Sequence, residues 1–146
     1  MLALAQKTYG AIPARALPAR KPRTEPEQKG LRRIDFKAPA EQAYVALAFH
    51  VPGVERIEDM QDGDRDGLAL MVLSAVLSGY DGARLERALT QGAERVADSA
   101  DSHASVFGRG PALFMLTGVP AAGKTADQVE AALRAQLERV AREGVS

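Results

Sequence analysis

Residues 112–143 read ALFMLTGVPAAGKTADQVEAALRAQLERVARE, and this stretch decides the fold. The apolar run at 112–117 predicts a strand with apolar side chains on both faces. Residues 118–125 contain two Gly and one Pro, which predict a turn. Beyond the turn, apolar residues recur at helical spacing and predict an amphipathic helix over 126–143. Its apolar stripe consists of Val129, Leu133, Leu137 and Val140.

The turn at 118–125 also matches G-x-x-x-x-G-K-[ST], the pattern of the phosphate-binding P-loop. A strand before the pattern and a helix after it are the context that it requires. A P-loop protein also needs a second apolar strand that ends in Asp, which holds the metal ion. The best upstream strand, 44–49, is followed by His50, and residues 126–146 predict only helix. The sequence therefore lacks the partner strand of a nucleotide site.

Helix capping gives this turn a structural role. Thr125 and Gln128 have the S/T-x-x-Q spacing of a capping box, which satisfies backbone N–H groups at a helix start. The pattern begins the helix at Ala126 and leaves Gly123 and Lys124 in the turn. We therefore interpret the motif as a strand-to-helix turn, and a small NTP-binding module remains the alternative.

Composition narrows the class of protein. The chain has 146 residues, enough for one domain with a hydrophobic core. Its formal net charge is +0, which gives no preference for nucleic acid or for an anionic membrane. No apolar run approaches the ~20 residues of a membrane span. With no Cys, the chain has neither disulfides nor thiolate metal sites. The 14 Arg against 5 Lys fit a GC-rich bacterial genome, but no compartment follows.

The N-terminal segment predicts a connector. Residues 1–5 are too short and lack the basic residues of a signal peptide, and they predict the tail of a helix that Gly10 ends. A chain that opens within a helix indicates a piece of a longer protein. We therefore predict a helix tail and basic linker over 1–30 and a single α+β domain over 31–146. The linker contains Pro13, Pro18, Pro22 and Pro26 among Arg15, Arg20, Lys21, Arg23 and Lys29.

The remaining elements complete the predicted fold. Residues 31–37 and 43–51 predict two strands that pair as a hairpin-like unit, the second one central because both its faces are apolar. A buried helix over 66–78 ends at Gly79, and a more polar helix over 83–95 buries Leu85 and Leu89. Residues 96–107 alternate as a solvated strand does. The order α-β-β-α-α-β-β-α predicts an α+β fold whose antiparallel or mixed sheet, of four or slightly more strands, is covered by helices on one face.

Two metal patterns are incomplete. Residues 62–67 read DGDRDG, the first half of an EF-hand loop, but the bidentate Glu of position 12 falls on Leu73. An acidic helix start, with Asp64 or Asp66 near the positive end of the helix dipole, explains them better. His50 and His103 are the only histidines and neither begins a zinc motif. They could meet at a metal only if their two strands brought them together.

A hydrolase arrangement is equally weak. Ser99, Asp101, Ser102 and His103 contain the residue types of a catalytic triad, but they lie close together on one predicted strand without a nucleophile elbow. We assign no catalytic, cofactor-binding or metal-binding residue to this chain.

Several segments in order resemble one family. The helix end and exit at 9–13 (YGAIP), the strand 44–52 (YVALAFHVP), the helix 66–79 (DGLALMVLSAVLSG) and the start at 83–89 (ARL…L) carry the likeness. The chain resembles the second, non-zinc-binding C-terminal domain of the pitrilysin/insulinase-type zinc peptidases, which include the mitochondrial processing peptidases. The likeness covers nearly the whole chain, and in this family a P-G-x-[ST] turn precedes the last helix.

The resemblance implies that the chemistry lies outside this chain. The family's zinc motif, H-x-x-E-H with a distant Glu, belongs to the preceding domain, so no zinc is expected here. Some members hold substrate with an Arg and a Tyr in a later domain, and the equivalent region here has Ala93 and Ala97, with Arg95 nearby. No catalytic residue is therefore carried over.

The implied function is that of a non-catalytic domain of a zinc metalloendopeptidase or of its inactive partner subunit. The domain would pack against the zinc-binding domain of the same parent chain or of a partner subunit, and form part of a chamber for the peptide substrate. In isolation it could form a homodimer, and bacterial members with this arrangement are often exported. The alternatives are the NTP-binding module and a plain protein-interaction domain.

Overall fold

The computed structural model of the chain describes residues 1–18, 26–55, 57–108 and 110–145. It contains two compact units, Met1–Lys37 and Ala38–Ser146. The first unit carries α1 (Leu2–Tyr9), which ends at Gly10 as predicted and has no buried residue. Part of the predicted linker, including Arg20, Lys21, Pro22 and Arg23, lies outside the described residues.

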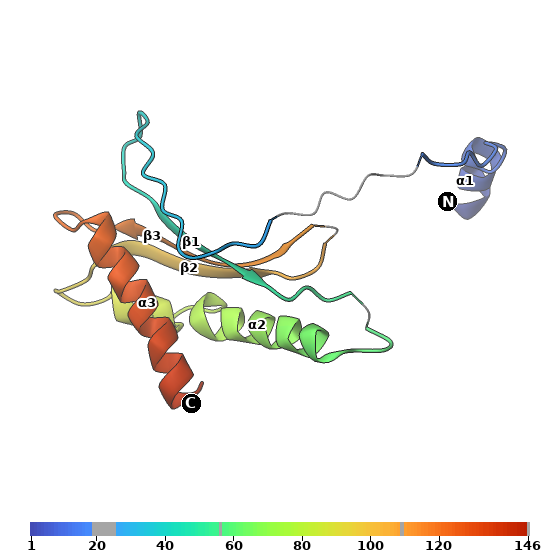
Figure 1. Cartoon of the computed structure of the whole chain (residues 1–146). Helices are drawn as coiled ribbons and strands as arrows, with labels where there is room; N and C mark the ends of the chain where they lie inside the picture. The colour runs from blue at the N-terminus through green and yellow to red at the C-terminus, as the bar shows by residue number, and fades with distance from the viewer. Residues whose placement is uncertain (19–25, 56, 109, 146) are drawn as a thin grey trace. The chain divides into compact units, whose positions relative to one another are not determined.

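The second unit is built on an antiparallel sheet of β1 (Val45–Val51), β2 (Ala97–Ser105) and β3 (Ala112–Pro120), shown in Figure 1. The strand order is β1-β3-β2, so β3 lies in the centre. Leu116 of β3 pairs with Leu47 of β1 on one side and with Ser102 of β2 on the other. The run at 112–117 is therefore the central strand because it is apolar on both faces.

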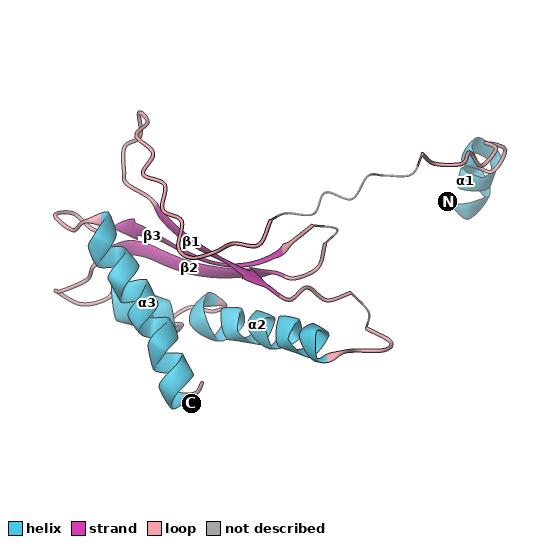
Figure 2. Cartoon of the chain, viewed as in Figure 1, coloured by secondary structure: helices cyan, strands magenta, loops and turns pink. Residues whose placement is uncertain are grey.

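Three helical segments cover one face of this sheet: α2 (Asp62–Ser78), η1 (Glu86–Thr90) and α3 (Ala126–Glu143). Figure 2 shows α2 and α3 on the same side of the strands. Both helices and η1 contact the sheet, α2 and η1 at β2 and α3 at β3 and β1. The core lies between these two layers, and it consists of Leu77, Leu85, Leu89, Ala97, Ala100, Phe114, Leu116, Val129 and Leu133.

Helix α3 approaches the sheet closely at Gly118. A Cβ atom on this residue would lie 2.7 Å from Val129 Cγ1 and 3.7 Å from Leu133 Cδ1. Val129 and Leu133 belong to the apolar stripe of α3, and both are fully buried. Because Gly118 has no side chain, α3 can pack directly on the backbone of β3.

A cluster of serines joins α2 to β2. Ser102 Oγ lies 2.8 Å from Ser78 Oγ and 3.2 Å from Ser74 Oγ. The backbone N–H of Ser102 donates to Ser78 Oγ at 2.9 Å, and Ser102 Oγ donates to the carbonyl of Ser74 at 3.0 Å. These bonds satisfy polar groups that packing removes from water, and they fix the position of α2 along the strand.

The first half of the sheet differs from the prediction. Residues 31–37 form no strand, and the side chains of Leu31, Ile34 and Phe36 are exposed. The predicted hairpin with 43–51 is therefore wrong. β1 lies at an edge of the described sheet and is not central, because it pairs only with β3. Its inward side chains, Val45, Leu47, Phe49 and Val51, are partly buried, and Ala46, Ala48 and His50 are exposed. The prediction of a central strand counted the small side chains Ala46 and Ala48 as a second apolar face, although both are exposed.

Two helix predictions also change. The helix predicted over 83–95 is a single π turn at 86–90, since Gln91 and Gly92 turn the chain and the Val96 N–H bonds the Leu89 carbonyl at 2.9 Å. Its predicted apolar residues, Leu85 and Leu89, are nevertheless buried. The helix predicted over 66–78 begins earlier, at Asp62, and one of its sides is exposed.

Other predictions are confirmed. The fold is α+β, with helices on one face of an antiparallel sheet. The solvated strand is β2, with Ser99, Asp101, His103 and Ser105 exposed and the alternate residues turned inward. The amphipathic helix 126–143 is α3. Within the described residues the sheet has three strands where four were predicted, and the element order is α1 β1 α2 η1 β2 β3 α3.

The contact at Gly118 gives the first testable prediction. Gly118→Ala places a methyl group within 2.7 Å of Val129 Cγ1, so α3 or β3 must shift. We expect the free energy of unfolding, measured by urea denaturation, to fall by about 1–3 kcal/mol, as overpacking does in other cores. Gly110→Ala is the matched control, because nothing lies within 4 Å of its added Cβ. Equal stability of the two variants would contradict the proposed close packing.

Candidate functional site

The segment that resembles a P-loop is a β-turn between β3 and α3. Gly118, Val119 and Pro120 still belong to β3, and Gly118 pairs with both neighbouring strands. The turn itself spans Ala121–Lys124, with the Lys124 N–H donating to the Ala121 carbonyl at 2.9 Å. Gly123 has a φ of 78°, the left-handed region that such a turn requires and that glycine adopts at low cost.

Several backbone N–H groups of this segment, which a P-loop would direct at phosphate, are already engaged. The Ala121 N–H donates to the Val96 carbonyl at 3.1 Å. The Thr125 N–H donates to Gln128 Oε1 at 2.8 Å, and the Gln128 N–H donates to Thr125 Oγ1 at 3.3 Å. This is the predicted capping box, and it is confirmed, with α3 beginning at Ala126. The Thr125 hydroxyl that would hold Mg²⁺ in a P-loop serves instead as a helix cap.

The acidic stretch at 62–67 is also structural. It forms the first turns of α2, not a loop. The buried carboxylate of Asp64 accepts the N–H of Glu55 at 2.7 Å and that of Gln61 at 2.9 Å. Gly67 is required by packing, since an added Cβ would lie 3.1 Å from the Pro52 carbonyl oxygen. The interpretation as an acidic helix start is confirmed for Asp64.

The two histidines lie on the outer face of the sheet but do not meet. His50 pairs with Leu113 and His103 pairs with Met115, on opposite sides of β3. Both histidines are exposed. Within residues 1–18, 26–55, 57–108 and 110–145, no three His, Cys, Asp or Glu side chains lie where they could hold a metal ion together.

Of the four residues with the side-chain types of a hydrolase triad, Ser102 lies on one face of β2 and the other three lie on the opposite face. Ser102 points inward and bonds to α2, whereas Ser99, Asp101 and His103 are exposed on the other face. Alternation along a strand makes this separation unavoidable. His103 therefore cannot activate Ser102 as a nucleophile.

Residues 93–97, which the resemblance aligned with a substrate-holding Arg and Tyr, carry alanines in this chain. Ala97 is fully buried at the start of β2, and Ala93 lies in the exposed turn before it. Arg95 forms an ion pair with Asp98 at 3.2 Å. Neither of the two alanines can contact a substrate through a charged or hydroxyl group.

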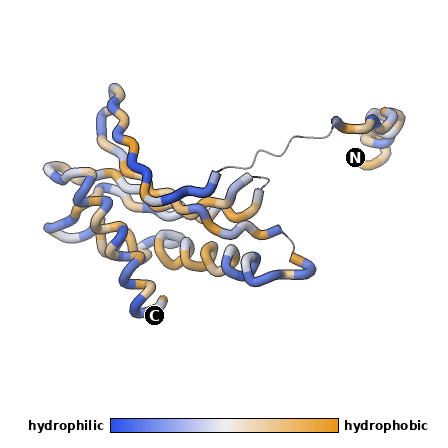
Figure 3. Tube along the Cα trace, viewed as in Figure 1, coloured by the Kyte–Doolittle hydropathy of each residue, from blue (hydrophilic) through white to orange (hydrophobic). Residues whose placement is uncertain are grey.

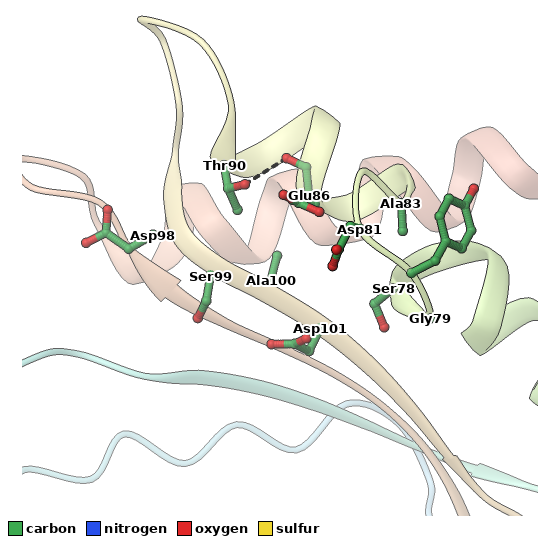
Figure 4. A pocket seen from close by; sticks show the side chains of 11 residues that line it. Ser78, Gly79, Asp81, Ala83, Glu86, Thr90, Asp98, Ser99, Ala100 and Asp101 are labelled. Atoms are coloured by element: carbon green, nitrogen blue, oxygen red, sulfur yellow. Dashed lines mark hydrogen bonds between the residues drawn. The ribbon is translucent and has the colours of Figure 1, made fainter.

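Next to this region lies a hollow of about 390 Å³, the acidic hollow, drawn in Figure 4. It lies between the turn that follows α2, η1 and the first half of β2. The Glu86 carboxylate accepts the Gly82 N–H, and Thr90 Oγ1 donates to the Glu86 carbonyl at 2.9 Å. No histidine lines it, so it offers electrostatic attraction without a general base of the usual kind. Four acidic residues belong to its lining, Asp81, Glu86, Asp98 and Asp101, of which Asp98 is paired with Arg95.

The sequence did not indicate this hollow. Its lining comes from residues 78 to 101, which are brought together by the turn after α2 and by the π turn that replaces the predicted helix. The only available signal was the density of Asp and Glu between residues 81 and 101.

The outer side of α2 is apolar, although it faces solvent. No charged residue occurs between Asp66 and Asp81, so the helix is hydrophobic all round beyond its first turns, as Figure 3 shows. Val72 is 62% exposed, and Met71 is 39% exposed. A surface helix normally has a polar outer face, and an apolar one marks a contact with a partner. We call Leu68, Ala69, Met71, Val72 and Ala75 the α2 outer face.

Comparison with known proteins places the chain in one family. It matches the family described as Peptidase M16 inactive domain over residues 1–146, and it belongs to that family. A search of curated proteins found no match. The resemblance to pitrilysin- and insulinase-type C-terminal domains is thereby confirmed at the level of the family. Membership implies a parent in which this inactive domain has a partner domain.

The helices carry no sign of a membrane span. Among the residues that the structure describes, no helix is both long enough and apolar enough to cross a bilayer.

The capping box gives the second prediction. Thr125→Ala removes the oxygen that accepts the Gln128 N–H, and we expect the free energy of unfolding to fall by about 1 kcal/mol. Thr125→Ser keeps the hydroxyl and should retain most of the stability. Thermal or urea unfolding of the three proteins tests this, and loss of stability in the serine variant equal to that in the alanine variant would contradict a capping role.

Proposed function

We propose that this chain is the non-catalytic domain of a zinc metallopeptidase, or of its inactive partner subunit. It packs against the zinc-binding domain and forms part of the wall of the chamber that receives the peptide substrate. The observation that carries this proposal is the α2 outer face, an apolar surface on a domain whose family is defined by a larger parent.

Burial of this face supplies the driving force for packing. Covering a valine or leucine side chain contributes about 1.5–3 kcal/mol. Val72 and Met71 lie on the exposed side of α2, while Leu77 on its opposite side is fully buried in the core. The helix can therefore contact a second domain without giving up its packing on the sheet.

The zinc ion belongs to the partner in this proposal. When bound, zinc polarises a peptide carbonyl and lowers the pKa of a water molecule. With two histidines on opposite sides of β3 and no cysteine in the sequence, the described part of the chain offers no set of three ligands for it. Its own residues contribute surface to the chamber, including the acidic hollow, which favours cationic groups on a bound peptide.

Two other functions are tested alongside this one. The NTP-binding module is favoured by the motif at Gly118–Thr125, and the engaged N–H groups of the turn argue against it. A plain protein-interaction domain would use the same α2 outer face without a peptidase parent. The parent reading frame distinguishes this function from the peptidase domain. An H-x-x-E-H motif within about 200 residues upstream, which is one domain length, supports the peptidase domain.

The third prediction concerns the partner domain. Co-expressed with the segment that carries H-x-x-E-H, this chain should form a stable complex on size-exclusion chromatography. Val72→Glu places a charge on the α2 outer face and should weaken the complex by about tenfold or more, the cost of burying an unpaired charge.

Val145→Glu is the matched control, because Val145 is 57% exposed, lies beyond α3 and is not part of the α2 outer face. A complex that survives Val72→Glu would contradict packing through this face. The same chromatography on the isolated chain tests whether it forms a homodimer, and a homodimer built on the α2 outer face should become a monomer in Val72→Glu.

The fourth prediction concerns metal and nucleotide. The metal-stripped chain should take up no stoichiometric zinc on titration, and one equivalent of tightly held zinc, lost in His50→Ala or His103→Ala, would overturn the proposal. A fluorescent ATP analogue should show no saturable binding. Micromolar binding that Lys124→Ala abolishes would instead establish the NTP-binding module.

A further inference from the structure

A second hollow, of about 360 Å³, lies between η1 and the C-terminal half of α3. Its lining consists of Arg84, Arg87, Ala88, Gln136 and Arg139, and we call it the arginine hollow. Three positive charges and no carboxylate line it, although the whole chain has a formal net charge of +0. Guanidinium groups gathered in this way match the two oxygens of a carboxylate or the oxygens of a phosphate.

One carboxylate of the chain already interacts with this cluster. Glu143 Oε2 accepts the Arg139 Nε–H at 2.7 Å. This hydrogen bond holds the pKa of Glu143 below its ordinary value, and the charges of Arg139, Arg142 and Arg84 lower it further. Arg84 and the end of α3 are therefore close enough to act on one anionic group together.

The ion pair between Arg139 and Glu143 is open to competition. Their side chains are 59% and 54% exposed, so water and salt screen the pair. An oxyanion in the hollow would have Arg84, Arg87 and Arg139 in the surrounding lining, whereas Glu143 pairs with Arg139 from the end of α3. A ligand that makes several charge-assisted hydrogen bonds can displace a side chain that makes one.

Gln136 supplies an independent observation. Its Oε1 atom is buried and has no hydrogen-bond partner among the described residues. A buried polar atom without a partner requires an explanation. An oxyanion cannot satisfy this buried acceptor, so the group that Gln136 offers to the ligand is the NH₂ of the same amide, an uncharged donor in the lining of the hollow.

We propose that the arginine hollow binds an oxyanion from outside the chain, and that Glu143 is the internal carboxylate which this ligand displaces. The ligand is a carboxylate of an acidic peptide or a phosphate group, since both have the oxygens that the hollow recognises. The site lies on the other side of η1 from the acidic hollow, and it does not depend on the proposed role in a peptidase.

The test uses the folded chain labelled with ¹⁵N, so that the Nε–Hε signals of its arginines can be followed by NMR. Acetyl-tetraglutamate amide and inorganic phosphate are titrated separately at low ionic strength, with acetyl-tetraglutamine amide as the neutral control. We expect saturable shifts of Arg84, Arg87 and Arg139 with at least one of the two anions. A response to the peptide alone assigns a carboxylate ligand, and a response to phosphate alone assigns a phosphate ligand.

Variants separate a site from general attraction. Arg87→Gln should weaken binding by about tenfold, the scale of one charge-assisted hydrogen bond. Glu143→Gln should strengthen binding severalfold, because the competing carboxylate is gone. Arg134→Gln is the matched control. Arg134 lies on α3, as Arg139 does, but it pairs with Glu130 at 2.9 Å and does not line the hollow.

Three outcomes would overturn the proposal. One is the absence of saturable shifts with either anion in the folded chain. Another is equal weakening in Arg87→Gln and Arg134→Gln, which would show that net charge alone attracts the anion. The last is a Glu143→Gln variant with unchanged or lower affinity, which would show that Glu143 does not compete. Unchanged backbone spectra of the variants show that each remains folded.

Discussion

The close packing of α3 on the backbone of β3 is the constraint on which the rest of the domain depends. Val129 and Leu133 lie over Gly118, and both are fully buried. This contact joins the central strand to the one strongly amphipathic helix. Because β1 and β2 pair only with β3, the position of α3 on Gly118 also sets which residues of the flanking strands face the core.

A second, polar constraint fixes α2. The hydroxyl groups of Ser74, Ser78 and Ser102 bond to one another and to backbone groups, so this helix cannot rotate without leaving them unpaired. The fixed rotation turns Leu77 inward and Val72 outward. The apolar outer face is therefore a consequence of how the helix is held, and a partner that covers it meets a surface already in place.

Local patterns in the sequence predicted the elements whose signals are self-contained. Thr125 and Gln128 defined the start of α3 because a capping box depends on four consecutive residues, and the inward residues of β2 followed from strict alternation. The capping box also explained the motif at 118–125 without a ligand. These signals involve neighbours in the chain, and the structure confirms each of them.

The missed features depend on distant residues. β1 read as central because Ala46 and Ala48 are apolar, but alanine is small enough to tolerate exposure at a sheet edge. The strand predicted at 31–37 has an alternating pattern, which cannot show whether a partner strand is present. Neither hollow could be predicted from local sequence patterns, because the fold brings their residues together. Arg84 and Arg139 come from segments far apart in the chain, and Asp81 and Asp101 meet across a turn.

The π turn at 86–90 has a further consequence. Its neighbouring residues Glu86 and Arg87 line different hollows, so a thin segment of chain separates a hollow with acidic residues in its lining from one lined by arginines. A protein without net charge can in this way carry a local electric dipole. Such a dipole orients the domain before it touches a charged partner, so ionic strength would change the rate of productive encounters more than the strength of the final complex.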